Sequence, residues 1–158
     1  MLREPKDDFR GTPVTMLYEP PPKGERSMNL NPMPNRSANE MRDLVEAELS
    51  GIGNAETVRG IHTFLVEPRM EMRFWDWGET AKDYPVWVVA ESSRYDYGIV
   101  FSDYGFAPDR PWGLVFLSRR NFDADYCWYS TLADAYRDSR LLEEHEEAKT
   151  DSQIEDAI

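Results

Sequence analysis

Imidazole and thiol groups carry most nucleophilic and zinc chemistry in proteins, and this chain has only two histidines and one cysteine. His62 has apolar neighbours and His145 lies in an acidic run, and no His-x-x-x-His or paired-cysteine spacing occurs. Cys127 lies among acidic and aromatic residues, which raise the pKa of a thiol rather than lower it. We therefore expect no zinc site, and a Cys127 that packs as a small hydrophobic residue.

Phosphate-binding loops and carboxylate sites are no better supported. The sequence has no Gly-x-Gly-x-x-Gly or Gly-Lys-Ser/Thr motif, and the Asp123-x-Asp125 pair lacks the further oxygen ligands of a calcium loop. A carboxylate pair for glycoside cleavage stays an open alternative, since strand spacing can bring together some of Glu67, Glu71, Asp76 and Glu91. Because nothing selects one pair, we expect no catalytic residue, no metal and no cofactor, and an enzyme is the less favoured class.

The aromatic residues carry the clearest functional signal. The stretch FSDYGFAPDRPWGLVF at 101–116 contains a connection longer than the usual hairpin loop, and its glycines and prolines make it stiff. Stiff aromatic loops lose little entropy on binding, and charged neighbours can form bonds at the rim. Together with two tryptophans further up the chain, this loop supplies the predicted binding residues: Trp75, Trp77, Tyr104, Phe106, Asp109, Arg110 and Trp112.

Three alternatives to this binding site stay open. The loop can pack on itself with Phe106 as a plug for the end of the sheet, and the N-terminal arm can cover the face that carries Trp75 and Trp77. The aromatic residues can also line a pocket for a small molecule, or a cryptic hydrolase site. The residues expected in such a pocket are Trp75, Trp87, Tyr104 and Trp112, with Glu91 or Asp103 as the polar group.

Local patterns predict the elements that must position these residues. Ser37 and Glu40 form a capping box before an apolar stripe, which predicts a helix over 38–50 ended by Gly51. From Ile61 the apolar residues recur with a period of two, which predicts one long bent strand, or two strands broken at Pro68. On this strand Met70, Met72 and Phe74 should face the helices, and Glu71, Arg73, Trp75 and Trp77 the other side.

The rest of the chain is predicted to form a hairpin, a further strand and a helix. The runs at 86–91 and 97–102 suit an antiparallel hairpin, and 112–118 suits another strand. Thr131 and Asp134 open a last helix whose first three turns should dock on the domain. One shared core is expected to contain Met41, Leu44, Val45, Val88, Ile99, Val115, Leu132 and Tyr136.

These elements predict a single α+β domain with a mainly antiparallel sheet of about four to six strands and two flanking helices. A Pro-rich N-terminal arm over 1–36 holds seven of the eleven prolines and has no hydrophobic period. The domain should span 37–145, and an acidic C-terminal tail should follow over 146–158.

Charge narrows the classes of partner. A net charge of −12 and a pI near 4.6 oppose tight contact with nucleic acid or an anionic membrane surface, and favour a protein partner with a basic surface. The N-terminus MLREPKDDFRG lacks the apolar core of a signal peptide, and a single cysteine suits a reducing compartment, so a cytoplasmic location is expected.

We therefore expect a non-enzymatic acidic binding protein that neutralises or regulates a basic protein partner, in the manner of bacterial immunity proteins and enzyme inhibitors. That comparison is an analogy of shape and charge. Two alternatives come from other classes: a small-molecule-binding or hydrolase domain with an aromatic pocket, and a structural subunit that docks through its N-terminal arm. The oligomeric state is not predicted.

Overall fold

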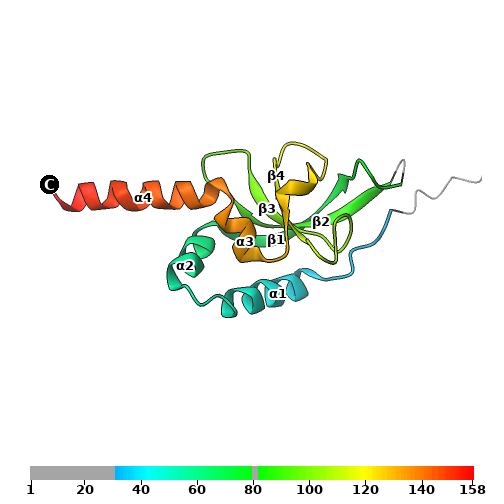
Figure 1. Ribbon diagram of the computed structural model, residues 1–158, viewed down its shortest axis with the longest axis horizontal. Helices are drawn as coiled ribbons and strands as arrows, with labels where there is room; N and C mark the ends of the chain where they lie inside the picture. The colour runs from blue at the N-terminus through cyan, green and yellow to red at the C-terminus, as the bar shows by residue number, and fades with distance from the viewer. Residues whose placement is uncertain (1–30, 80–81) are drawn as a thin grey trace, which may run out of the picture.

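A five-stranded antiparallel meander, β1-β2-β3-β4-β5, forms the centre of one α+β domain (Figure 1). The computed structural model describes residues 31–79 and 82–158. The predicted class is confirmed, with four α-helices in the described residues where the sequence suggested two. The elements are α1 (Ala38–Ser50), α2 (Ala55–Phe64), β1 (Leu65–Phe74), β2 (Asp83–Glu91), β3 (Gly98–Phe101), β4 (Trp112–Val115), a 3₁₀ turn (Asp125–Cys127), β5 (Trp128–Tyr129), α3 (Leu132–Arg137) and α4 (Arg140–Asp156).

Helix α1 forms as its capping signal predicts. The Ser37 hydroxyl accepts from the Glu40 amide, and the Glu40 carboxylate accepts in return from the Ser37 amide, so two of the unpaired donors at the helix start are satisfied. The helix ends before Gly51 and buries Met41, Val45 and Leu49 on one face.

Helix α2 corrects the prediction of a strand from Ile61. Asn54 caps the helix by accepting from the Glu56 and Thr57 amides, and the helix then continues to Phe64. Ile61 and Phe64 lie three residues apart and are both buried, which is helical spacing rather than alternation. His62, expected in a strand, is an exposed residue of this helix.

Strand β1 is one strand with an irregularity where the sequence has Pro68. Its pairing with β2 shifts register between Leu65 and Arg69. Pro68 has no amide hydrogen, and it is tolerated here because β1 is an edge strand, whose outer side needs no hydrogen-bond donor. From Arg69 to Phe74 the pairing is regular. The predicted hairpin is also confirmed, since β2 and β3 pair antiparallel. Strand β4 is shorter than predicted, and the two-residue β5 was not predicted.

The predicted last helix is two helices. Thr131 caps α3 by accepting from the Asp134 amide, but the helix ends at Arg137, and Ser139 caps α4 by accepting from the Leu141 amide. The acidic residues expected in a C-terminal tail are part of α4 as far as Asp156, and this helix extends away from the sheet (Figure 1). No described helix is both long and apolar enough to cross a membrane.

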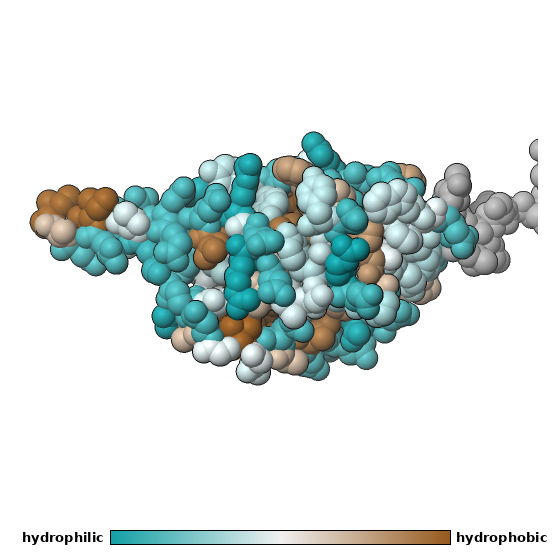
Figure 2. Space-filling view, viewed as in Figure 1, coloured by the Kyte–Doolittle hydropathy of each residue, from teal (hydrophilic) through white to brown (hydrophobic). Residues whose placement is uncertain are grey.

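The start of α4 is fixed to the β2–β3 turn by a buried carboxylate. Glu144 accepts from the Ser92 hydroxyl at 2.6 Å, from the Ser93 amide at 3.2 Å and from the Ser93 hydroxyl. Burial of a carboxylate is tolerated here because several donors replace its lost water. Further along, every residue from Thr150 is exposed, and Ile154 and Ile158 give the projecting end an apolar tip on an otherwise largely hydrophilic face (Figure 2).

A second junction joins α4 to α2 through Glu56. Its carboxylate accepts from Lys149 and from Arg59, and His145 Nε2 lies 3.2 Å from its Oε1. Hydrogen bonds from Lys149, Arg59 and His145 hold the pKa of Glu56 at about 2. The charged form of this carboxylate therefore ties the two helices together.

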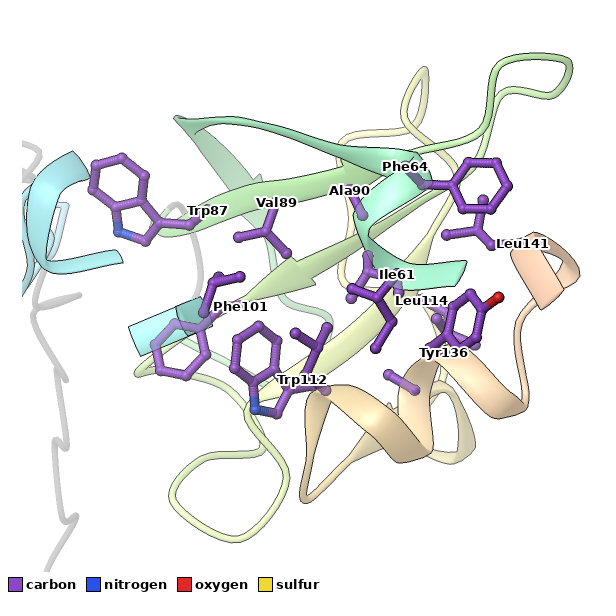
Figure 3. Close-up of a cluster of buried hydrophobic side chains, with 14 of the residues drawn as sticks. Ile61, Phe64, Trp87, Val89, Ala90, Phe101, Trp112, Leu114, Tyr136 and Leu141 are labelled. Atoms are coloured by element: carbon purple, nitrogen blue, oxygen red, sulfur yellow. The ribbon is translucent and has the colours of Figure 1, made fainter. Parts of the chain in front are cut away.

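The core is divided between the two faces of the sheet, so the prediction of one shared core was wrong. On the helix side, Met41, Val45, Ile99, Leu132 and Tyr136 pack in one cluster, with Leu44 half-buried against it. Figure 3 shows part of this cluster, with Tyr136 near Leu114 and Ile61. Val88 and Val115 belong to a second cluster on the opposite face. Successive strand side chains point to opposite faces, so residues from one buried strand necessarily contribute to both clusters.

Candidate functional site

Three connections cover the sheet face that the helices leave free: β1–β2, β3–β4 and β4–β5. Their aromatic residues form one network with aromatic residues of the adjoining strands, which we call the aromatic face. Ring centroids in this network lie 5.2–6.3 Å apart, the separation at which aromatic pairs attract, and four of the eight pairs are edge to face. The members are Trp75, Trp77, Tyr84, Tyr104, Phe106, Phe122 and Trp128.

Phe106 contacts three other rings of the aromatic face. Its ring centroid lies 5.7 Å from that of Trp75, 5.6 Å from that of Trp77 and 5.8 Å from that of Trp128. The guanidinium of Arg110 lies 5.6 Å from the same ring. The loop therefore packs on the face through Phe106, as the plug alternative proposed, and at the same time supports an exposed neighbour.

Gly105 lets the loop reach this position. Its φ of +71° is a conformation that residues with a Cβ rarely adopt, and a Cβ here would lie 2.4 Å from the ring of Phe122. The turn and the close approach thus both require glycine, and they bring Phe106 over the sheet.

The β4–β5 connection is held by Arg73, whose side chain is 1% exposed. Its guanidinium donates to the carbonyls of Phe116, Arg119 and Asn121 at 3.3, 2.5 and 3.1 Å, and to Glu71 at 3.1 Å. The sequence predicted Arg73 on the side of β1 that faces away from the helices. That prediction of the face is correct, but the β4–β5 loop, distant in sequence, covers Arg73, and no local pattern indicates this.

The same loop also pairs with the end of β1. The Phe74 amide donates to the Arg120 carbonyl at 2.6 Å, and the Phe122 amide donates to the Phe74 carbonyl at 2.9 Å. Phe122 and Trp128, which sequence reasoning missed, are thereby brought under Trp75 and Phe106. Their only sequence signal was an aromatic type within a loop-like stretch.

The structure brings together most of the predicted binding residues and separates one. Trp77 is 65% exposed, whereas Trp75, Tyr104 and Phe106 are half-buried in the aromatic face. Trp112 is 1% exposed and packs in the cluster on the helix side, so it does not belong to the surface. Asp109 is exposed at the loop tip.

The last residues of the arm line one border of the aromatic face. The Tyr104 hydroxyl donates to the Met33 carbonyl at 2.8 Å, and Arg36 pairs with Asp103 at 3.3 Å. The alternative in which the arm covers Trp75 and Trp77 concerns residues that lie mostly outside the described part of the chain. Within it, residues 31–36 reach Tyr104 and leave Trp77 exposed.

Exposed carboxylates lie on the three loops of the aromatic face. Asp76, Asp109 and Asp125 form no ion pair with any residue that the structure describes, and all three are exposed. The Arg110 guanidinium donates to the backbone carbonyl of Asp125 at 3.2 Å and so draws the second and third connections together. These loops thus present unpaired carboxylates to a cationic partner, alongside the arginines Arg110, Arg119 and Arg120.

A shallow cleft of about 280 Å³ adjoins Trp77, between Trp75 and Asn121. The indole Nε1 of Trp75 and the side-chain oxygen of Asn121 are buried without a hydrogen-bond partner in the described residues. Each buried polar atom without a partner carries a desolvation cost.

A larger cleft of about 510 Å³ lies beside the end of β4, beyond the short β5. Tyr97, Phe116, Tyr126 and Tyr129 contribute aromatic walls, and Cys127 lies among them. Burial and the nearby Asp123 raise the pKa of the Cys127 thiol, so its thiolate is not favoured. Burial, together with a hydrogen bond to Asp138, raises the pKa of Tyr129 to about 12.

The aromatic pocket predicted from the sequence does not form as expected. Trp87 and Trp112 pack in the helix-side cluster, whereas Trp75 and Tyr104 pack on the opposite face of the sheet. The sheet itself separates the two pairs. No group of three His, Cys, Asp or Glu side chains in residues 31–79 and 82–158 is arranged to hold a metal ion.

Fold and site together define an acidic α+β domain with helices on one face of an antiparallel meander. The other face is covered by loops that carry aromatic residues and exposed carboxylates. No protein-family model, curated protein or solved structure matches the chain.

Proposed function

We propose that this protein is a non-enzymatic binding protein that recognises a basic protein partner, and neutralises or regulates it, through the aromatic face. The observation that carries the proposal is Trp77, an indole 65% exposed to solvent beside a cleft that Asp76 and Asp123 also line. Large exposed aromatic residues with a polar rim are typical of binding hot spots, where tryptophan is enriched.

The surroundings of Trp77 favour binding energetically. Its ring rests edge-on against Phe106 at 5.6 Å, and Phe106 is held in turn by Trp75 and Trp128. A side chain already supported by its neighbours loses less conformational entropy when a partner covers it. Most of its binding energy is then available to the complex.

The charges favour a basic partner. Asp76, Asp109 and Asp125 lie on the loops of the aromatic face without an ion-pair partner among the described residues, and the whole chain carries a net charge of −12. Complementary charge steers association and speeds it, and salt screens the effect over about 10 Å at 0.1 M. Binding should therefore weaken, and its on-rate fall, as salt increases.

Affinity capture from an extract of the source cells tests this function. The bait is the full chain, and the matched variants are Trp77→Ala on the aromatic face and Tyr95→Ala in the β2–β3 turn, at the opposite end of the strands. The expected result is a basic protein retained at low salt by the wild type and by Tyr95→Ala but lost with Trp77→Ala. Retention of no protein at low salt would contradict the proposal.

The captured partner then allows a quantitative measurement. Calorimetry should give an affinity for Trp77→Ala weaker by about 2 kcal/mol, or about thirtyfold, with no change for Tyr95→Ala. Asp76→Asn, Asp109→Asn and Asp125→Asn combined should chiefly slow association and reduce its dependence on salt. Equal losses from both aromatic variants would show that the aromatic face is not the contact surface.

A second candidate function is small-molecule binding in the cleft beside β4. Its volume of about 510 Å³ falls in the range of ligand pockets, and Tyr97, Tyr126 and Tyr129 offer hydroxyls on aromatic walls. A ligand-observed NMR screen with aromatic fragments tests it. Fragments that bind the wild type should lose affinity with Tyr126→Ala and keep it with Trp77→Ala, and a screen without hits would remove this candidate.

A further inference from the structure

The outer edge of β1 leaves backbone groups free for another strand. Phe74 directs both its amide and its carbonyl away from β2, because both bond to the β4–β5 loop. Backbone groups alternate in direction along a strand, so the amides and carbonyls of Met72 and Met70 point outward as well. Pro85 stands opposite Met72 on β2 and has no amide hydrogen to donate to it. This agrees with Met72 groups that point away from β2. Among the described residues no backbone partner occupies these outward groups.

Apolar side chains border this free edge. Met70 and Phe74 are each 42% exposed, although the sequence predicted that the helices would cover them. Met70 stands opposite Trp87, which packs on the helix side, so the predicted face is correct and only the cover is missing. The edge therefore combines free hydrogen-bonding groups with exposed apolar area.

The charges along β1 identify the occupant. Counted outward from Met70, Arg69 on one side matches Glu71 on the other, and Glu67 matches Arg73. Within one chain Arg69 already pairs with Glu71 and Glu91, so a second copy would add to these ion pairs. The pattern is therefore antisymmetric in charge about Met70. A charged edge strand ordinarily repels other strands, but a pattern of this kind is complementary to itself when the second strand runs antiparallel.

We propose that two copies of this chain pair antiparallel through β1, with the two-fold axis at Met70. The Met70 residues of the two copies then exchange amide-to-carbonyl bonds, and the Met72 amide of each copy donates to the Pro68 carbonyl of the other. Arg69 of each copy faces Glu71 of the second copy, and the exposed methionines meet at the axis. The paired region is five residues long.

Neighbouring contacts limit the pairing to that length. Beyond Met72 the β4–β5 loop already occupies the edge at Phe74. On the other side the register shift before Arg69 bends the strand, and Glu67 is paired with Arg42 of α1. So short an interface gives a dimer that dissociates on dilution, and this self-association does not depend on the aromatic face or its partner.

Charge reversal tests the pairing directly. Sedimentation equilibrium of the full chain from about 10 µM to about 1 mM should show a monomer–dimer equilibrium. Arg69→Glu and Glu71→Arg, each alone, put like charges across the axis and should weaken dimerisation at least about tenfold, while the double variant restores opposite charges and should recover it. Arg69→Glu is the decisive single variant, because Glu71 also accepts from the buried Arg73. Thermal melting of each variant at low concentration shows whether the fold is retained.

Disulfide trapping locates the axis independently of stability. In a Cys127→Ser background, Met70→Cys should form a covalent dimer under mild oxidation, because residues paired across the axis have their Cα atoms within disulfide reach. Met33→Cys, a control outside β1 that is more exposed (76% against 42% for Met70), should nevertheless react much more slowly. A chain that stays monomeric at about 1 mM, single reversals that leave the dimer unchanged, or equal trapping at both positions would each overturn the proposal.

Discussion

Replacing Arg73 with methionine should destabilise the domain far more than replacing any exposed arginine, because Arg73 holds the β4–β5 loop against the sheet. Methionine keeps an apolar stem of similar length and removes the donors. The carbonyls of Phe116, Arg119 and Asn121, which Arg73 bonds at 2.5–3.3 Å, then lose their charged donor. Buried polar groups left without partners cost about 1–3 kcal/mol each, although such costs are not additive within one network.

For the whole site we expect a loss of about 2–3 kcal/mol in the free energy of unfolding, because polar groups lose a charged donor while Glu71, 30% exposed, keeps its ion pair with Arg69. With an m-value of about 1.5 kcal/mol/M, the urea midpoint should fall by about 1.3–2 M. The matched control is Arg137→Met, which removes an exposed ion pair with Asp134 and should cost about 1 kcal/mol or less.

Urea unfolding followed by tryptophan fluorescence gives the free energy, and hydrogen exchange gives the location. The Phe122 amide, bonded to the Phe74 carbonyl at 2.9 Å, should lose protection in Arg73→Met before the rest of the sheet does. If the variant unfolds within about 1 kcal/mol of the wild type with Phe122 still protected, Arg73 is not what holds this loop.

Three further predictions concern the helices. The pKa of Glu56 is about 2 in the folded chain against an ordinary 4.5, so the stability it contributes is present above pH 4.5 and lost as the pH falls from 4.5 towards 2; melting temperatures across that window should show this loss in the wild type and less of it in Glu56→Gln. Gly60→Ala should destabilise by about 1–3 kcal/mol or more, since its new methyl group would lie 2.0 Å from the Tyr136 hydroxyl, and Gly60→Ala with Tyr136→Phe should recover part of the loss in a urea titration. Met41→Ala should cost about 2–5 kcal/mol and the half-buried Leu44→Ala less, and the reverse order in the same titration would show that α1 docks on a different face.

Two of the four described helix starts were predicted correctly from the sequence. Ser37 with Glu40 and Thr131 with Asp134 mark real helix starts, because an N-cap depends on hydrogen bonds within one turn of the chain. The Asn54 cap is equally local but was overlooked, so the end of α2, from Ile61, was predicted as a strand. The position of each capped start was therefore available in the sequence.

The candidate site was predicted only in part. Trp75, Trp77 and Phe106 do meet, since a strand end and a loop at the same end of a meander are near each other in space. Trp112 was assigned to the same surface and is instead core, because the pairing Phe101↔Trp112 puts its side chain on the helix side. The face to which a residue belongs depends on register, and register is a relation between strands.

The sequence by itself determined the properties that belong to single residues and to short segments: the net charge of −12, the scarcity of histidine and cysteine, the caps and the strand-forming runs. Which face of each segment is buried depends on the tertiary structure. Arg73 is buried under a loop more than forty residues away in sequence. Met70 is exposed on a free edge, and Trp77 packs against Phe106. The physical reason is that burial is set by what packs against a residue from elsewhere in the chain, and no short window of sequence contains that neighbour.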